Sequence, residues 1–396
     1  MYNFEYWLEH AIEKSLRIYN ALLLRKPGRA PEPSRVKKIL ICAYHGIGNF
    51  ILYTPTIDAI RRYFPEAEID LQVGNKTGCE DVLADSGHFR KVFDVSNKAG
   101  WRIWIEHILH IRHSRYNLII NEFHSNSYFL AMLVSFSGAT YRVGHVKSPG
   151  WPDRYGFIYN VAVKMEESEH EVDRYFALAR ALNIPDHFLK RRPFIHINTA
   201  DEAFADQFLK TNKIPSNKLL IGIQMGTSVN MRWKQWSPER YQHLVKEILT
   251  RYEDSYLLML GSPNELDMIE QSLKQIGQEG SARIAISAGS TTIKEVAALI
   301  KRCNLVICND SGLMHVSVAV DTPVVAIYGP TDYRRTAPIG NIHTIVRKNL
   351  SCSPCFRLEG DAQVQKCTHH DCLNKLEVNE VIEAVERKIS ELVASQ

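Results

Sequence analysis

The chain has 396 residues, 45% of them hydrophobic and 23% charged, with a formal net charge of +4. This length exceeds what one simple core supports, so we expect two domains, and the small charge without a recognisable RNA- or DNA-binding motif argues against a nucleic-acid partner. No run of eighteen apolar residues occurs and the first residues lack a signal-peptide pattern, so we expect a cytoplasmic protein.

Residues 1–35 read as a separate N-terminal arm. Aromatic and aliphatic residues such as Trp7 and Ile12 alternate with basic residues such as Lys14 and Arg17, and a linker rich in proline, glycine and arginine follows. This pattern predicts an amphipathic basic helix. Two interpretations stay open: residues 1–30 lie on the anionic surface of the inner membrane, or the helix docks on the protein itself or on a partner subunit.

Residues 36–190 alternate between strand and helix patterns and predict an α/β domain. The segment 36–44 is a strand that enters the glycine turn His45-Gly46-Ile47-Gly48-Asn49. A helix follows, with Thr54-Pro55 matching an N-cap and first helical position. Further strands are expected at 67–73 and 116–123, and the second of these ends in polar residues that include Glu122 and His124. The carboxyl ends of parallel strands are where α/β proteins bind ligands.

The remaining residues predict a second α/β domain at 219–375. Residues 191–218 are rich in proline and charge and are assigned to an interdomain segment, and 376–396 to a C-terminal helix. Strands are expected at 219–224 and 256–260. A loop with Thr227, Ser228, Met231 and Lys234 follows the first strand, and Gly261 to Glu265 follow the second.

The segment 305–332 reads as strand, tight turn, helix, turn and strand. Its turn, Asn309-Asp310-Ser311-Gly312, has helix N-cap chemistry and precedes a helix predicted at 313–320. Backbone N–H groups and the helix dipole both favour an anion at such a helix N-terminus. The alternative is an ordinary βαβ turn with no ligand.

These motifs together resemble glycosyltransferase family 9, the heptosyltransferase-like enzymes. In the first half the resemblance rests on Gly46-Ile-Gly-Asn-x5-Pro55. In the second half it rests on Gly226-Thr-Ser, Lys234-x-Trp236-Ser-Pro238, Gly261-Ser-Pro and Asn309-Asp-Ser-Gly-x-x-His315 with Tyr328-Gly-Pro-Thr. The resemblance implies the GT-B fold, with two facing Rossmann-like domains and a cleft between them. It also implies inverting transfer of a sugar, usually heptose from ADP-heptose, to a lipopolysaccharide-type acceptor.

The resemblance assigns the donor side to a set of residues in the second domain. The leaving diphosphate needs stabilisation as charge builds on it, and hydroxyls, backbone amides and a lysine supply it. Asp310 is expected to contact the sugar or orient the turn. Glu265 is expected to contact the ribose of the nucleotide, and Met231 its nucleobase. No Asp-x-Asp occurs, so we expect catalysis without a metal. The residues implied in diphosphate or nucleotide binding are Thr227, Ser228, Met231, Lys234, Gly261, Glu265, Ser311, Gly312, Leu313 and His315.

The acceptor side departs from the family pattern. Many members carry Gly-Asp in the first loop, where the aspartate is the presumed base, whereas this chain has Gly46, Gly48 and Asn49. An amide cannot accept the acceptor's proton. His45, Glu122 and His124 are equal candidates for the base. The substitution also keeps two other functions open: an inactive sugar-nucleotide-binding homologue with an assembly or regulatory role, and a sugar-nucleotide epimerase of the same architecture.

Four cysteines near the C-terminus form a compact cluster, Cys352-x2-Cys355-x11-Cys367-x4-Cys372. One paired motif with two further thiols can form a tetrahedral zinc or iron site, and autotransporter heptosyltransferases that carry a cysteine-bound iron resemble this part of the chain. Disulfides and free thiols are the alternatives. Any metal here is expected to be structural.

Overall fold

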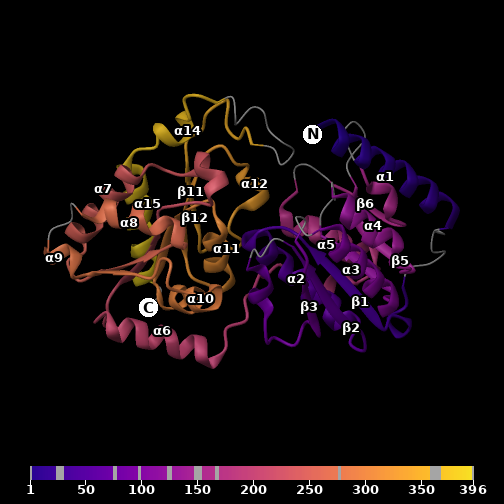
Figure 1. The fold of residues 1–396 in the computed structure, drawn as a ribbon. Helices are drawn as coiled ribbons and strands as arrows, with labels where there is room; N and C mark the ends of the chain where they lie inside the picture. The colour runs from indigo at the N-terminus through magenta and orange to yellow at the C-terminus, as the bar shows by residue number, and fades with distance from the viewer. Residues whose placement is uncertain are drawn as a thin grey trace. The chain divides into compact units, whose positions relative to one another are not determined.

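The computed structural model describes residues 2–23, 31–74, 78–96, 100–122, 127–146, 154–165, 169–274, 278–356 and 367–394. The chain forms two compact units, Met1–Arg191 and Arg192–Gln396. Each unit holds a six-stranded sheet in which every pairing is parallel (Figure 1). Buried parallel strands connected by helices are the arrangement that the alternating sequence pattern predicts.

The sheet of the first unit has the order β3-β2-β1-β4-β5-β6. Its strands are β1 (Lys38–Ala43), β2 (Glu68–Val73), β3 (Lys91–Asp94), β4 (Leu118–Asn121), β5 (Tyr141–Val146) and β6 (Val161–Lys164). Its helices are α1 (Tyr2–Leu23), α2 (Ile47–Tyr63), α3 (Trp101–Ser114), α4 (Tyr128–Phe136) and α5 (Glu171–Ala181). The strand order reverses between β1 and β4, and ligands of such sheets bind beyond the carboxyl ends of the strands at that point.

The second unit repeats this topology, with the order β12-β11-β10-β7-β8-β9. Its strands are β7 (Leu220–Gln224), β8 (Tyr256–Leu260), β9 (Ile284–Ile286), β10 (Leu305–Asn309), β11 (Val324–Tyr328) and β12 (Thr344–Arg347). Its helices are α6 (Thr199–Thr211), α7 (Pro238–Arg251), α8 (Leu266–Leu273), α9 (Gln278–Ser281), α10 (Ile293–Arg302), α11 (Gly312–Ala319), α12 (Tyr333–Thr336), α14 (Asp371–Asn374) and α15 (Val378–Ala394). The reversal lies between β7 and β10, so the two units carry equivalent ligand positions.

Helix α6 lies in the segment 191–218, which the sequence assigned to an interdomain connection. Asn198 and Asp201 form a capping box at its start. The helix packs on α10 of the second unit, where Lys301 donates to Glu202 at 2.8 Å and Arg302 to Asp206 at 2.8 Å. This segment therefore includes a structural helix of the second unit.

Helix α2 begins earlier than predicted, because Thr54 and Pro55 are not its N-terminus. The helix starts at Ile47 with Gly46 as N-cap, and Pro55 lies inside it. Proline has no N–H to donate to the carbonyl four residues earlier, which here belongs to Ile51. The Thr54 hydroxyl donates to that carbonyl at 2.8 Å instead. The side chain thus satisfies the acceptor that the proline leaves, and the helix continues.

Helix α1 docks on its own unit, beside α4 (Figure 1). Leu16 is buried against the core, and Asn20 accepts a hydrogen bond from the buried Arg142 at 2.8 Å. Arg154 pairs with Glu13 at 3.2 Å. The face of α1 that carries Leu16 and Asn20 therefore docks on the protein itself, which is one of the two interpretations left open by the sequence.

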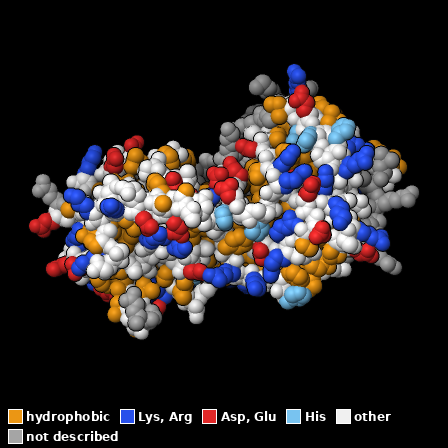
Figure 2. All heavy atoms as spheres, turned by 90° about the horizontal axis from the view of Figure 1, so that it is seen from below, with side chains coloured by type: hydrophobic (Ala, Val, Ile, Leu, Met, Phe, Trp, Pro, Cys, Tyr) orange, Lys and Arg blue, Asp and Glu red, His pale blue; other side chains and the backbone are white. Residues whose placement is uncertain are grey.

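Figure 2 shows lysine and arginine side chains interspersed with aspartate and glutamate over the face turned to the viewer. Within the described ranges, no helix is both long enough and apolar enough to cross a membrane.

Candidate functional site

The carboxyl ends of β7 and β10 hold the first group of candidate residues. Asn309 is the last residue of β10 and is buried. Its Nδ2 donates to the carbonyls of Met225 at 2.9 Å and Gly226 at 3.2 Å, and its Oδ1 accepts from the backbone N–H of Trp236 at 3.0 Å. Asn309 therefore fixes both ends of the loop that follows β7. In this turn, Ser311 and not Asn309 is the N-cap of helix α11.

Lys234 and Asp310 form an ion pair at this edge of the sheet. Nζ of Lys234 lies 3.0 Å from Oδ2 of Asp310, and the two side chains are 18% and 5% exposed. Burial by itself raises the pKa of Asp310, but Lys234 and, to a smaller extent, the hydroxyl of Thr331 act against burial, and the pKa lies below its usual value. His315, also buried, contributes to this lowering. The carboxylate is therefore ionised at neutral pH, and the lysine is held beside the start of α11.

Helix α11 begins directly after this pair. The hydroxyl of Ser311 donates to Oε1 of Gln224 and makes no capping hydrogen bond to the helix. The cap therefore leaves the first-turn N–H groups, which include those of Gly312 and Leu313, without a side-chain acceptor. An anion is favoured at such a position by these donors and by the helix dipole.

Thr227 and Ser228 occupy different environments in the loop after β7. Thr227 is buried, and its hydroxyl donates to the carbonyl of Met231 at 3.0 Å. Ser228 is exposed and precedes the short helix η5 (Val229–Lys234). To donate to a phosphate, the Thr227 hydroxyl must give up its hydrogen bond to Met231 and become accessible. Ser228 is already exposed.

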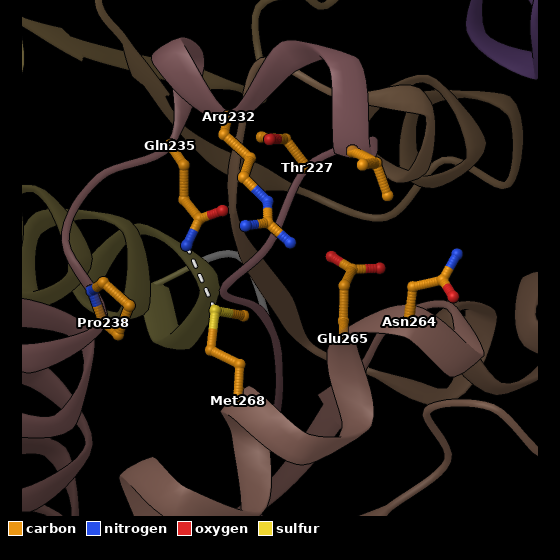
Figure 3. Close-up of a pocket in the computed structure, with 8 residues that line it drawn as sticks. Thr227, Arg232, Gln235, Pro238, Asn264, Glu265 and Met268 are labelled. Atoms are coloured by element: carbon orange, nitrogen blue, oxygen red, sulfur yellow. Dashed lines mark hydrogen bonds between the residues drawn. The ribbon is translucent and has the colours of Figure 1, made fainter.

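A pocket of about 270 Å³ opens beside this loop (Figure 3). In Figure 3 the guanidinium of Arg232 and the carboxylate of Glu265 point toward one another, and Nε2 of Gln235 reaches the sulfur of Met268 at 3.1 Å. The lining residues are Thr227, Val229, Arg232, Gln235, Pro238, Asn264, Glu265 and Met268. Met231 and Gly261, which the sequence also assigned to the donor side, do not line this pocket.

Glu265 is the buried charged residue of the pocket. Its Oε2 accepts from the backbone N–H of Ser262 at 2.6 Å, while its buried Oε1 has no hydrogen-bond partner among the described residues. Gly226 and Gly261 make room for this carboxylate: a Cβ added at Gly226 would lie 1.9 Å from Oε1, and one at Gly261 would lie 3.2 Å from Oε2. A carboxylate oxygen with a spare acceptor position suits a ligand hydroxyl.

Sequence reasoning missed Arg232, Gln235, Asn264 and Met268. Arg232 and Gln235 lie in the same loop as the predicted Lys234, and Asn264 precedes the predicted Glu265. Position in these two loops was the only signal for these three residues, and Met268, which lies in helix α8, had no such signal. Which of them line a pocket depends on how the two loops fold toward one another.

The second group lies at the carboxyl ends of β1 and β4. Oε1 of Glu122 accepts from the backbone N–H groups of Tyr44 at 2.7 Å and His45 at 3.0 Å, and lies 2.8 Å from Nδ1 of His45. Glu122 is 1% exposed, whereas the His45 side chain is 23% exposed. Burial lowers the pKa of His45, but the charge and hydrogen bond of Glu122 outweigh burial and raise it above its usual value.

The other acceptor-side residues surround the start of α2. Gly46 is the N-cap, and Gly48 and Asn49 are the second and third residues of the helix, so the predicted acceptor loop is largely the first helical turn. His124 lies outside the described residues. Among the three candidate bases, the structure thus joins His45 and Glu122 in one hydrogen-bonded pair.

The cysteine cluster contains no disulfide, and its members differ in exposure. Cys352 is exposed, Cys355 and Cys367 are half-buried, and Cys372 is buried. Burial raises the pKa of the Cys372 thiol to about 11, and the other three thiols contribute. Within the described part of the chain, no three His, Cys, Asp or Glu side chains are gathered closely enough to hold a metal ion.

Comparison with known proteins places these features in a family. The family profile described as "Glycosyltransferase family 9 (heptosyltransferase)" matches residues 104–364. Lipopolysaccharide heptosyltransferase 2 of Escherichia coli (strain K12) is 25% identical over 327 residues, covering 78% of this chain and 88% of that protein.

Two solved structures show the same fold. A glycosyl transferase family 9 protein from Veillonella parvula DSM 2008 has a TM-score of 0.73 and 20% identity, covering 90% of this chain and 98% of that one. E. coli ADP-heptose lps heptosyltransferase II has a TM-score of 0.70 and 21% identity, covering 90% and 99%. The expected GT-B fold is thereby confirmed, and the chain belongs to glycosyltransferase family 9, the heptosyltransferases.

Proposed function

We propose that this protein transfers heptose from ADP-heptose to a lipopolysaccharide-type acceptor, with inversion at the sugar's anomeric carbon. Relatives of similar length are named lipopolysaccharide heptosyltransferases, and one solved structure of the same fold is named for ADP-heptose. The observation that carries the proposal is the Lys234–Asp310 pair at the start of α11, next to the loop that lines the Glu265 pocket.

The donor side would bind the nucleotide and stabilise its leaving group. The spare Oε1 of Glu265 would accept from a ribose hydroxyl. Lys234 and the first N–H groups of α11 would bind the diphosphate, where negative charge grows as its bond to the sugar breaks. Asp310 holds Lys234 in place and would orient the sugar. Protein cations and amides would serve where an Asp-x-Asp motif would otherwise bind a metal, so the transfer would need no metal.

The acceptor side would supply the base. The acceptor oxygen forms a bond to the anomeric carbon while the bond from that carbon to the diphosphate oxygen breaks, and ADP leaves with the electron pair. The acceptor's proton would pass to Nε2 of His45. Glu122 would accept a hydrogen bond from Nδ1–H of His45, which leaves Nε2 free to take the acceptor's proton. Its negative charge would then stabilise the imidazolium. The half-buried His45 suits this role better than Glu122, which is almost fully buried.

The acceptor class is the least constrained part of the proposal. A glycolipid of the lipopolysaccharide type follows the names of the relatives, and polysaccharide and protein acceptors are the alternatives. A glycolipid acceptor is anchored in a membrane, so the proposal includes peripheral contact of residues 1–30 with the cytoplasmic face of the inner membrane.

Acceptor-dependent release of ADP tests the transfer. Purified protein, ADP-heptose and heptose-deficient lipopolysaccharide should give ADP and an acceptor heavier by one heptose, with the opposite anomeric configuration by NMR. A chelator should leave the rate unchanged. ADP-heptose that binds but is never consumed with any acceptor class would favour the inactive homologue, which Asn49 suggests. Conversion of the donor to another sugar nucleotide without an acceptor would indicate an epimerase.

We also propose that the cysteine cluster, if it closes around zinc or iron, does so as a structural site. Metal-free protein should react with iodoacetamide first at the exposed Cys352 and slowly at the buried Cys372, whose raised pKa keeps it protonated. A bound metal would protect all four thiols until a chelator is added. Rapid alkylation of every cysteine in freshly purified, untreated protein, with no metal in that protein, would contradict the metal site.

A further inference from the structure

Two helices of the first unit expose most of the large apolar side chains that the described residues leave in contact with solvent. Eleven such side chains are exposed, and seven of them lie on α1 or α3. They are Trp7, Ile18 and Leu22 on α1, and Trp101, Ile103, Ile105 and Leu109 on α3. Single exposed apolar residues are normal, but such a concentration marks an interaction surface.

The exposed stripe on α1 is separate from the face that docks the helix. Trp7, Ile18 and Leu22 are 74%, 62% and 76% exposed and follow the helical repeat along one side. Leu16 and Asn20, which hold the helix on its unit, point to the opposite side and are buried. The helix is therefore apolar on two faces, and docking accounts for only one of them.

A groove of about 410 Å³ joins α1 to α3. Tyr19 of α1, Ile105 and Leu109 of α3 and Phe136 of α4 contribute to its apolar lining, and the rings of Tyr19 and Phe136 lie 4.8 Å apart. Arg112 is the charged residue of the lining and donates to the carbonyl of Phe136 at 3.0 Å. The groove thus places Tyr19 of α1 near the exposed Ile105 and Leu109 of α3.

Positive charge borders this apolar surface. On α3 and directly after it, Arg112 and Arg115 are exposed, while the exposed Arg102 pairs with Glu106. On α1, Lys14 is exposed, whereas Arg17 pairs with Glu13, and Arg154 pairs with both Glu9 and Glu13. Aromatic and aliphatic side chains flanked by arginine and lysine are typical of helices that lie in the interface of an anionic membrane.

We propose that α1, α3 and the groove between them form one membrane-docking surface, the α1–α3 surface, whose partner is an anionic lipid bilayer. The exposed apolar side chains enter the boundary between headgroups and acyl chains, and the arginines and lysines bind anionic headgroups. This inference rests on the proposed function for its biological purpose, because a membrane-anchored acceptor needs an enzyme at the membrane. It extends the expected contact from the N-terminal arm to α3, which the sequence did not implicate.

Vesicle binding without donor or acceptor tests the surface directly. The full chain should sediment with vesicles of phosphatidylethanolamine and phosphatidylglycerol, and more weakly with phosphatidylcholine vesicles or at high salt. Ile105→Ser/Leu109→Ser and Trp7→Ser/Ile18→Ser should each lower the partition coefficient at least about tenfold. Val393→Ser is the matched control, because Val393 is 69% exposed but lies on α15 of the other unit.

A second measurement does not depend on the folding of any variant. Hydrogen exchange on the unmodified protein should show new protection in residues 2–23 and 101–114 when anionic vesicles are added. Absence of vesicle binding, equal binding to phosphatidylcholine, or an equal loss with Val393→Ser would overturn the proposal. Concentration-dependent self-association that the same double variants abolish would assign the surface to a second copy instead.

The outcome is also separable from that of the proposed function. Both double variants should transfer heptose to a delipidated acceptor as fast as the unmodified protein, while losing rate on acceptor embedded in vesicles. A protein that binds vesicles through this surface but transfers nothing would contradict the proposed function and leave the docking surface standing.

Discussion

Replacing Lys234 with methionine should destabilise the second unit, and the loss should depend on pH. At 3.0 Å and an effective dielectric constant of about 20, the attraction between Lys234 and Asp310 is about 5.5 kcal/mol before desolvation is subtracted. Removing the lysine leaves an uncompensated carboxylate that is 5% exposed, and breaking such a buried pair costs about 3–5 kcal/mol. We therefore expect Lys234→Met to lower the free energy of unfolding by about 3 kcal/mol at neutral pH.

The sign of the pH dependence follows from the two pKa values of Asp310. In the unmodified protein the folded-state pKa is lowered, so its stabilising contribution is present above the unfolded-state pKa and is lost as pH falls through the folded-state value. Without Lys234, burial is opposed by only the smaller effects of Thr331 and His315, so the folded-state pKa rises and protonation relieves the buried charge. The difference in stability between variant and unmodified protein should therefore shrink as pH falls from neutrality toward the raised pKa of Asp310 in the folded variant.

The double variant Lys234→Met/Asp310→Asn separates folding from ligand binding. Without either charge, the second unit should recover to within about 1 kcal/mol of the unmodified protein, measured by urea unfolding and by hydrogen exchange in strand β10. ADP affinity should stay low, because Lys234, which is proposed to bind the diphosphate, is absent. If the double variant regained ADP affinity, Lys234 would serve only the fold. If Lys234→Met were as stable as the unmodified protein, or equally destabilised at every pH, the ion-pair reasoning would be refuted.

Three further predictions concern the base, the helix that carries the acceptor loop, and the ribose contact. The rate with saturating donor should rise with pH as His45 loses its proton, at a pKa above the usual value of histidine. Glu122→Gln should move this rise to lower pH, because the carboxylate that raises the pKa is gone. A rise at unchanged pH would contradict the pairing. Thr54→Val should cost about 1–2 kcal/mol in thermal unfolding. Thr56→Val should cost little, because the buried Thr56 hydroxyl has no hydrogen-bond partner within the described ranges; equal losses would refute the role given to the Thr54 hydroxyl. Glu265→Gln should weaken ADP binding about tenfold by calorimetry, and should leave the affinity for the deoxy analogue that lacks the contacted hydroxyl unchanged; equal weakening for both nucleotides would exclude a ribose contact.

Local patterns in the sequence predicted the central strands of the second unit well. The strand expected at the start of the segment 305–332 is β10 (Leu305–Asn309), and the helix expected at 313–320 is α11 (Gly312–Ala319). These elements are contiguous apolar runs bounded by turn residues, so neighbouring residues determine them. Strand β6 (Val161–Lys164) was missed because it lies at the edge of its sheet, where burial alternates and the apolar run is short.

Contacts between distant residues were less predictable. His45 and Glu122 were both recognised at strand ends, but their hydrogen bond joins residues 77 positions apart and depends on β1 and β4 being neighbours. Pro55 misled the prediction of α2 for a related reason. Thr-Pro matches a helix start, and only the three-dimensional position of the Thr54 hydroxyl shows how a helix passes through that proline.

The same pairing gives a physical reason why Asn49 need not abolish catalysis under the proposed function. A carboxylate at position 49 would lie in the first turn of α2, where the helix dipole favours its ionised form and makes it a weaker base. His45 precedes that helix, and Glu122 raises its pKa above the usual value of a histidine. A base whose pKa lies nearer to neutral pH accepts a proton more effectively in the transition state. The chain would thus have moved the base from the helix to His45, two residues after β1, with the buried Glu122 directly after β4 supplying the negative charge that Asn49 lacks.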